Sequence, residues 1–211
     1  MKIKVFVCNP FEEHTYIVYD ESGEALIIDP GFYDEREFIP AKEFIEENHL
    51  KLRRLLNTHL HLDHSIGNRF IEETFGVSAS ASKADEFLQE KANDQAVMFG
   101  LPWRGRIPEI KTFLKEGDSI DIGSLSFRVL EVPGHTPGGL AFYEKNESTV
   151  FAGDSLFCGG IGRTDLPGGS ERTLLKSIHE KLLTLPKETI VLPGHGPSTT
   201  IADEIPNSDL F

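Results

Sequence analysis

Hydrophobic residues near the start of the chain fall into short runs that proline, glycine or acidic residues interrupt. Runs of this length, rich in β-branched residues, predict a meander of strands over 3–8, 16–19 and 25–28. Between 37 and 48 the apolar positions change to a spacing of about 3.6 residues, which predicts a helix. Strand character returns at 52–56. The first part of the chain is therefore expected to combine a strand meander with one helix and a further strand.

The rest of the chain repeats this alternation of short strands and amphipathic helices. Helices are expected where the helical stripe of apolar residues recurs, at 64–75, 83–99 and 170–183. The tail from 201 to 211 is expected to be irregular. Further strands are expected at 77–79, 119–122, 125–132, 140–143, 149–152 and 190–192.

The order of these elements determines the expected fold class. Strands come in runs within each half of the chain, and helices lie between and after them. That order favours an α/β (α+β) fold in which two mixed β-sheets pack face to face with helices outside, a four-layer αββα sandwich. No long linker interrupts the chain, so residues 1–211 are expected to form a single domain.

The densest polar feature of the sequence is the segment THLHLDH, residues 58–64, directly after a predicted buried strand. His59 and His61 are two positions apart, so at the end of a strand they share one side. Asp63 and His64 fall on the following turn and can reach the same point. Imidazole and carboxylate are ligands that suit zinc, iron or manganese. So dense a cluster predicts a metal site rather than a solvated polar turn.

Three later segments share one order of features: an apolar strand, a turn of small residues, and a ligand-type side chain. Glycine beside each of these side chains permits close backbone approach and unusual dihedral angles. Each segment alone is typical of an ordinary polar turn, but together with residues 58–64 they predict convergent ligands. The candidate metal ligands are His59, His61, Asp63, His64, His135, Asp154 and His195.

This set of motifs resembles the metallo-β-lactamase superfamily, from Cys8 to about Thr200. The resemblance implies the metallo-β-lactamase fold and two adjacent divalent metal ions. Zinc is the ion we favour, although these ligands also accept iron or manganese. The resemblance implies one ion at His59, His61 and His135, a second at Asp63, His64 and His195, and Asp154 as the bridge between them.

The residues after Asp154 resemble the glyoxalase II branch, the hydroxyacylglutathione hydrolases. In that branch a basic residue helps to hold the glutathione part of the substrate, and the resemblance gives this role to Arg163. A surface ion pair with Asp165 or Glu171 is the alternative for this side chain. Where full-length members have a tyrosine, this chain has Thr164, and it also lacks their C-terminal helical domain. A short form with the same reaction class and an open substrate is therefore expected.

The resemblance implies a metal-dependent hydrolase, and we favour a thioesterase that acts on hydroxyacylglutathione-like or other small acyl thioesters. A metal-bridging hydroxide held by Asp154 would be the nucleophile, and Asp63 is a candidate for proton handling as well as a ligand. The leaving thiolate needs no general acid, because a free thiol has a pKa of about 8.5. Asp29 and Thr58 are expected to orient ligand histidines from behind.

Two other functions stay open. The stretch 162–165 also resembles the persulfide dioxygenases of the same superfamily, which would use one iron on His59, His135 and Asp154. A binding module with purely structural metal ions is the other alternative. Closed structural sites usually have four cysteine or histidine ligands, however, which does not match a set that includes carboxylates.

Charge and cysteine content narrow the expected partners and compartment. The chain has 21 Lys and Arg against 34 Asp and Glu, a formal net charge of −13, which disfavours a nucleic-acid substrate. Cys8 and Cys158 are its two cysteines, so no disulfide framework is expected. Neither a signal peptide nor a membrane span is visible. We expect a cytoplasmic enzyme with a small anionic or thioester substrate; the oligomeric state is left open.

Overall fold

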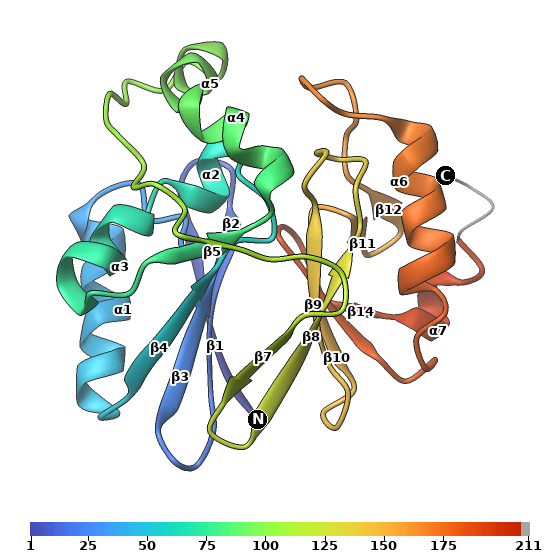
Figure 1. Ribbon diagram of the computed structural model, residues 1–211, viewed down its shortest axis with the longest axis horizontal. Coiled ribbons are helices and arrows are strands. Elements are labelled where there is room, and N and C mark those ends of the chain that lie inside the picture. Colours follow the sequence, from blue (N-terminus) through green and yellow to red (C-terminus); the bar gives the residue numbers. More distant parts are fainter. Residues whose placement is uncertain (208–211) are drawn as a thin grey trace.

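Two six-stranded mixed sheets pack face to face, with helices on their outer sides, in the computed structural model, which describes residues 1–207 (Figure 1). The αββα sandwich predicted from the sequence is therefore confirmed. The first sheet has the strand order β1-β2-β3-β4-β5-β6; it is antiparallel from β1 to β3 and parallel from β3 to β6. Its strands are β1 (Lys2–Cys8), β2 (Glu13–Tyr19), β3 (Glu24–Ile28), β4 (Lys51–Leu56), β5 (Ala79–Ala81) and β6 (Thr112–Phe113).

The second sheet has the order β14-β13-β10-β9-β8-β7, and only its β10–β13 pair is parallel. A short antiparallel ribbon of two strands, β11 (Leu156–Phe157) and β12 (Gly160–Ile161), follows β10. The strands of the second sheet are β7 (Ser119–Ile122), β8 (Leu125–Glu131), β9 (Leu140–Glu144), β10 (Thr149–Gly153), β13 (Ile190–Pro193) and β14 (Thr199–Thr200).

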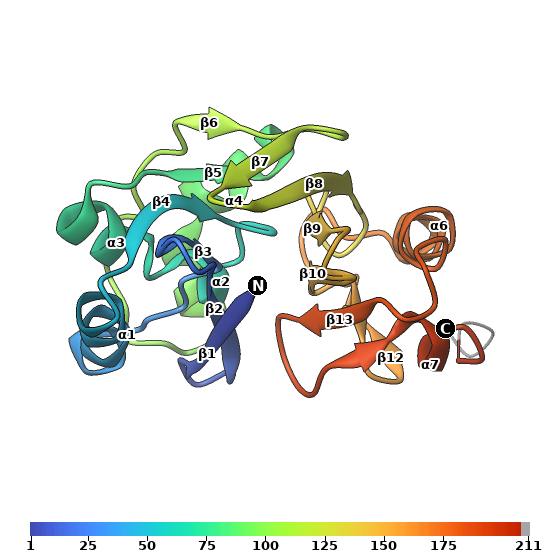
Figure 2. The ribbon, with the colours of Figure 1, turned by 90° about the horizontal axis from the view of Figure 1, so that it is seen from below.

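Helices cover the outer face of each sheet, and Figure 2 shows the two groups on opposite sides of the sandwich. Helices α1 (Glu35–Glu47) and α3 (Asn68–Phe75) lie against the first sheet, and α6 (Glu171–Ser177) lies against the second. None of the helices within residues 1–207 has the length and apolar character needed to span a bilayer. The remaining helical segments are α2 (Leu62–Ser65), a 3-10 turn (Lys83–Asp85), α4 (Glu86–Glu90), α5 (Ala92–Met98), a π-helical segment (Ile178–Leu182) and α7 (Ile201–Glu204).

The apolar core has separate layers because successive side chains of a strand point to opposite faces of the sheet. In β3, Leu26 and Ile28 face the second sheet, where they pack with Phe142, whereas Ile27 faces the helices and packs with Phe38. All five of these side chains are buried. A third layer lies between the second sheet and α6. Burial on both faces explains why these strands appear in the sequence as continuous apolar runs.

The parallel strand pairs bring the predicted site residues together. In the β3–β4 pair Ile28 lies opposite Leu56, so the residues that follow, Asp29 and Thr58, leave the same end of the sheet. In the β10–β13 pair Gly153 lies opposite Pro193. Since the carboxyl ends of parallel strands meet at one edge, the register sets the positions of the loops that carry the candidate ligands.

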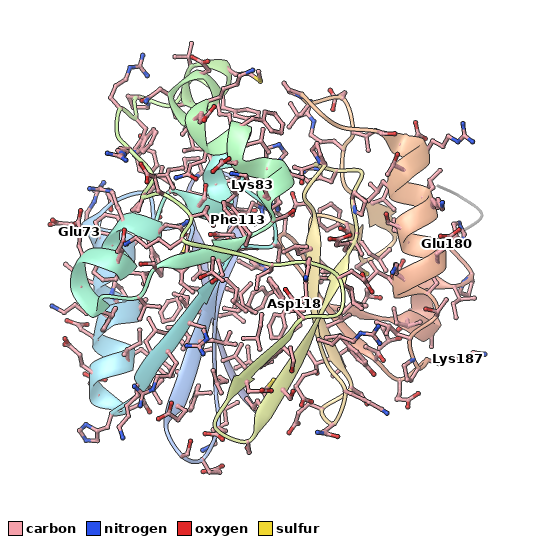
Figure 3. All side chains as sticks on the ribbon, viewed as in Figure 1. Glu73, Lys83, Phe113, Asp118, Glu180 and Lys187 are labelled. Atoms are coloured by element: carbon pink, nitrogen blue, oxygen red, sulfur yellow. The ribbon has the colours of Figure 1, made fainter. Side chains whose placement is uncertain are left out.

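Two predicted helices are interrupted in the structure. The helix expected over 64–75 breaks at Gly67, whose N–H donates to the carbonyl of Pro30 at 2.8 Å; a Cβ there would lie 2.4 Å from that oxygen. The helix expected over 83–99 is divided into a 3-10 turn, α4 and α5. Lys83 of the 3-10 turn packs on the Phe113 ring of β6, 4.5 Å from the ring centroid, and Figure 3 shows the two side chains close together. At Gly67 a tertiary contact therefore outweighs helical periodicity.

The strand and tail predictions also need correction. The strand expected over 77–79 lies at Ala79–Ala81 instead, because it pairs with β4 through Ala79 and Ser80. The tail is not irregular throughout: Ile201–Glu204 forms α7, with Thr200 as its N-cap and Ile201 buried in the core. The part of the expected tail beyond residue 207 lies outside the described residues.

Gly134, next to the candidate ligand His135, has the backbone conformation φ +139°, which side-chain-bearing residues rarely adopt, and a Cβ there would lie 2.2 Å from the Leu174 backbone nitrogen. Replacement by alanine is expected to lower the free energy of unfolding by about 2–4 kcal/mol, through backbone strain and overpacking together. Urea denaturation measures this loss. Gly76→Ala is the matched control, because Gly76 also has a positive φ of +69° but no atom within 4 Å of its Cβ position. Equal losses for the two variants would contradict the predicted clash with α6.

Candidate metal centre

All seven candidate ligands lie in segments that follow the carboxyl ends of strands, and two of them, Asp63 and His64, are on the short helix α2. Four follow β4, and one each follows β8, β10 and β13. Backbone hydrogen bonds hold two of these segments against neighbouring strands: the Leu140 N–H of β9 donates to the Thr58 carbonyl at 2.7 Å, and the His14 N–H of β2 donates to the Gly194 carbonyl at 2.8 Å. The structure therefore brings together the side chains of His59, His61, Asp63, His64, His135, Asp154 and His195.

The first group of side chains, the first triad, consists of His59, His61 and His135, whose potential ligand atoms all lie within 4.8 Å of one another. His61 Nδ1 lies 2.9 Å from His135 Nε2, and His59 Nε2 is buried without a hydrogen-bond partner. Burial, and then the neighbouring His135, lowers the pKa of His61 to about 3, so this imidazole is neutral at pH 7. Three imidazoles this close together, two of them with an unpartnered buried nitrogen, fit a bound cation.

The second group, the second triad, consists of Asp63, His64 and His195, again with all ligand atoms within 4.8 Å. His64 Nε2 lies 3.2 Å from His195 Nε2, and His195 Nε2 lies 3.4 Å from Asp63 Oδ2. His64 is fully buried, whereas the side chains of His195 and Asp63 are 24% and 19% exposed. The second triad is therefore the more accessible side of the centre.

Asp154 lies between the two triads. Its Oδ1 is 3.4 Å from His64 Nε2, and its Oδ2 is 3.6 Å from both His135 Nε2 and His195 Nε2. Oδ1 is buried and makes no hydrogen bond. Asp154 therefore contacts both triads: its Oδ2 is equally far from a histidine of each, and its Oδ1 is near His64.

Hydrogen bonds on the far side of the imidazoles fix which nitrogen carries the proton. His135 Nδ1 lies 2.6 Å from the Arg163 carbonyl oxygen, and His195 Nδ1 lies 2.9 Å from that of Phe11. Because a carbonyl only accepts, each Nδ1 must be the donor, and each Nε2 is the nitrogen that faces the centre.

Asp29 and Thr58 fix the position of the proton on His64 and on His59. Asp29 Oδ2 accepts from His64 Nδ1 at 3.0 Å and from the Thr58 hydroxyl at 2.5 Å, while its Oδ1 accepts from the Thr58 N–H at 2.7 Å. Since the Thr58 hydroxyl donates to Asp29, its oxygen is the acceptor for His59 Nδ1 at 3.1 Å. Asp29 is held at φ +48°, a strained conformation for a residue with a side chain. Both residues lie where the sequence analysis expected them, behind the ligand histidines.

The charges of His64 and Asp154 each shift the pKa of the other group. Burial opposes the charged form of His64, but the carboxylates of Asp154 and Asp63 outweigh it and raise the pKa of His64 well above its ordinary value. Burial likewise opposes the ionised form of Asp154, but His64 outweighs it, and the pKa of Asp154 is lowered. A metal cation that binds here must displace the His64 proton, so acid competes with the metal.

Two buried acids of this region were not predicted. Glu13 is fully buried, with Oε1 unpartnered and 4.0 Å from His64 Nδ1, and burial raises its pKa. Asp85 is also fully buried and accepts from the Leu60 N–H at 3.3 Å, the Thr136 hydroxyl at 2.8 Å and the Gly138 N–H at 2.6 Å. One carboxylate thus joins the loop after β4 to the loop after β8. In the sequence both acids lie in segments without ligand spacing, so no local signal identifies them.

Asp85→Asn is expected to weaken metal binding by about 10- to 100-fold, because the new amide must turn an N–H toward a donor and loosen both ligand loops. The unsatisfied group is also expected to lower stability by about 1–3 kcal/mol. Metal titration monitored by calorimetry measures the affinity, and excess metal should restore occupancy. Asp121→Asn, at an exposed position of β7, is the control. Unchanged affinity in Asp85→Asn would show that the carboxylate does not position the ligands.

The Arg163 side chain is exposed and paired with Asp165: Nε and Nη2 each donate to a carboxylate oxygen at 2.7 Å. This is the surface ion pair that the sequence analysis left as the alternative. A substrate carboxylate would have to compete with Asp165 for the guanidinium. The Arg163 backbone carbonyl, by contrast, is the acceptor for His135.

The chain combines an αββα sandwich with histidines and aspartates that converge at its strand ends. This combination is typical of one class of metal-binding enzymes. The chain belongs to the metallo-β-lactamase superfamily, whose family model matches residues 9–195. It is 40% identical to the hydroxyacylglutathione hydrolase GloC of Haemophilus influenzae, over 97% of this chain and 95% of that protein. It is 33% identical to the mitochondrial persulfide dioxygenase ETHE1 of Mus musculus, over 86% of this chain and 63% of that protein.

Solved structures of the superfamily have the same fold. The B3 metallo-β-lactamase BLEG-1 is 35% identical, with a TM-score of 0.86 and 97% of each chain covered. TTHA1623, determined in a di-iron-bound form, is 36% identical, with a TM-score of 0.83, 96% of this chain and 97% of that chain covered. Relatives whose names indicate different activities thus share this architecture, so the fold alone does not identify the substrate.

Proposed function

We propose that this protein is a metal-dependent thioesterase that hydrolyses hydroxyacylglutathione-like or other small acyl thioesters. The observation that carries the proposal is the convergence of the two triads on Asp154, whose oxygens lie 3.4–3.6 Å from imidazoles of both groups. The similarity to GloC of Haemophilus influenzae, a hydroxyacylglutathione hydrolase, supports the substrate class.

The residues fit a pair of divalent ions, with zinc as the ion we favour and iron or manganese as the alternatives. Bound there, the ions would polarise the substrate carbonyl and lower the pKa of a water from about 15.7 toward about 7. Burial alone would raise the pKa of Asp63, but His64 outweighs it and lowers that pKa. Asp63 is therefore ionised and partly exposed, so Asp63 Oδ2 can accept the proton of the attacking water.

The leaving group is the reason for choosing a thioester. A thiol has an ordinary pKa of about 8.5, so a thiolate departs without prior protonation. An alkoxide or an amide nitrogen would need a proton donor in the site. A small anionic substrate also agrees with two dications in a centre that provides only two ligand carboxylates, Asp63 and Asp154.

The test is to measure the metal content of the purified protein and its turnover of S-lactoylglutathione and simple acyl thioesters. Two equivalents of metal, with hydrolysis that requires them, are expected. Absence of metal-dependent turnover of every thioester tested would overturn the proposal.

Persulfide dioxygenase activity is the second candidate, because the mouse relative with that name is 33% identical. Such an enzyme would use one iron, on His59, His135 and Asp154, with open positions for dioxygen. Asp63, His64 and His195 would then have no metal role, although their ligand atoms cluster within 4.8 Å. One equivalent of iron, with oxygen uptake on glutathione persulfide and no thioester hydrolysis, would establish this function instead.

A further inference from the structure

A small apolar cavity lies beside the candidate metal centre. It is bounded by His61 of the first triad, by Leu88 of α4, by Met98 and Phe99 at the end of α5, and by Leu166 of the loop after β12. Its free volume is about 50 Å³, and its accessible wall is apolar throughout. Figure 1 shows α4 and α5 at the top of the sandwich, at the end to which the ligand loops lead.

Three residues with polar ends, Lys91, Asp94 and Gln95, also border the cavity, but no polar atom is part of its accessible wall. Gln95 contributes to the wall, but its Oε1 accepts from the Leu62 N–H at 3.0 Å and its Nε2 donates to the Leu88 carbonyl at 2.8 Å. Only the aliphatic part of Gln95 is left to face the cavity. A ligand group inside therefore meets an apolar accessible wall, which disfavours polar groups there.

The apolar surface continues from the cavity to the second triad. The Phe99 ring packs edge-on against Phe11 at 5.3 Å between centroids, and the Phe11 carbonyl is the acceptor for His195. Met98 at the rim is 57% exposed. Flexible methionine and aromatic side chains at the edge of a catalytic site adapt well to apolar substrate groups.

We propose that this cavity is the acyl-group subsite, and that it selects short saturated acyl groups over 2-hydroxyacyl groups. This inference rests on the proposed thioesterase function. Of the two parts of such a substrate, the thiol carrier glutathione is charged and polar, so the acyl group is the part that an apolar wall can bind. An apolar cavity of about 150 Å³ holds a benzene molecule, so a cavity of about 50 Å³ has room for only a few carbon atoms.

Chain length is the experimental variable. With metal-loaded protein and glutathione as the common carrier, kcat/KM is expected to rise about four-fold per methylene from acetyl through propionyl to butyryl, since each buried methylene is favourable. The lactoyl thioester should be a poorer substrate than the propionyl thioester, which lacks its hydroxyl. Equal kcat/KM for acetyl and butyryl, or a preference for lactoyl over propionyl, would overturn the inference.

Leu166→Asn places an amide in the cavity wall and is expected to reduce the butyryl-to-acetyl ratio of kcat/KM from about sixteen to about one. Val97→Asn is the matched control, because Val97 lies on α5 with 61% exposure outside the cavity, and it should leave the ratio unchanged. Thermal unfolding of both variants shows that they are folded. A wild-type ratio in Leu166→Asn would contradict the assignment even if thioester hydrolysis itself is established.

Product binding tests the cavity independently of turnover. Butyrate should bind the metal-loaded protein several-fold more tightly than acetate in calorimetric titrations, and Leu166→Asn should remove the difference. If no thioester is hydrolysed, the proposed function fails. The affinities for butyrate and acetate still test whether the cavity binds acyl groups. Equal affinities would overturn the assignment of the cavity as an acyl-group subsite, and a preference for butyrate would support that assignment.

Discussion

Asp154→Asn is expected to lose at least one equivalent of bound metal and about 10³-fold or more in kcat/KM for thioesters. Both carboxylate oxygens face imidazole Nε2 atoms of the two triads, and an asparagine would turn an amide N–H toward one of them. Metal activation contributes several kcal/mol to hydrolysis, and each 1.36 kcal/mol corresponds to a factor of about ten in rate. Metal analysis together with steady-state kinetics measures both effects.

Cys158→Ser is the control for this experiment. Cys158 is a free, exposed cysteine on the ribbon that follows Asp154, and no ligand role is assigned to it. The serine variant should keep wild-type metal content and kinetics. The bridging assignment would be untenable if Asp154→Asn kept two equivalents of metal and near wild-type turnover.

Removal of the metal by a chelator is expected to abolish hydrolysis and to lower stability. A ligand that binds only the native state stabilises it by about 4 kcal/mol when its free concentration is about 1,000 times its dissociation constant. Without metal, the Nε2 atoms of His59 and His61 are buried without a hydrogen-bond partner, and the pKa of His59 is driven well below its ordinary value, mainly by burial. Urea denaturation and activity measurements, before and after chelation, give the two effects.

Refilling distinguishes metal loss from damage. Zinc, iron and manganese should be added separately to the metal-free protein, with a chelator already saturated with metal as the control. Because the pKa of His64 is raised without metal, this histidine carries a proton at neutral pH that a metal ion must displace. Metal affinity should therefore fall as the pH is lowered. Full activity of the metal-free protein, or unchanged stability after chelation, would rule out the metal-centre interpretation.

The sequence allowed the fold and the ligand set to be predicted because both depend on local patterns. Each ligand lies in the segment that follows a short apolar strand, and parallel pairing with fixed register aligns the ends of β3 with β4 and of β10 with β13. His135 and Asp154 could therefore be connected to the histidine cluster of residues 58–64 without knowledge of the tertiary contacts. The two-sheet architecture followed from the order of the strands and helices.

What could not be predicted depends on contacts between distant segments. The breaks in the helices come from partners elsewhere in the chain, such as the Pro30 carbonyl that accepts from Gly67. Strands β6, β11, β12 and β14 have two residues each, too few for a periodic pattern. Asp85 is important because its acceptors meet donors from the loops after both β4 and β8, and no spacing in the sequence reveals that.

The position of Asp29 has a consequence for how the centre fills. A single oxygen of this carboxylate receives the His64 imidazole and, through the Thr58 hydroxyl, the chain of bonds that ends at His59. A metal ion that orders His64 therefore also helps to orient His59, and the reverse. We expect the two metal-binding events to be coupled for this reason. Occupancy should rise sigmoidally with added metal in the wild type, and Asp29→Asn should make the rise less steep, which a metal titration measures.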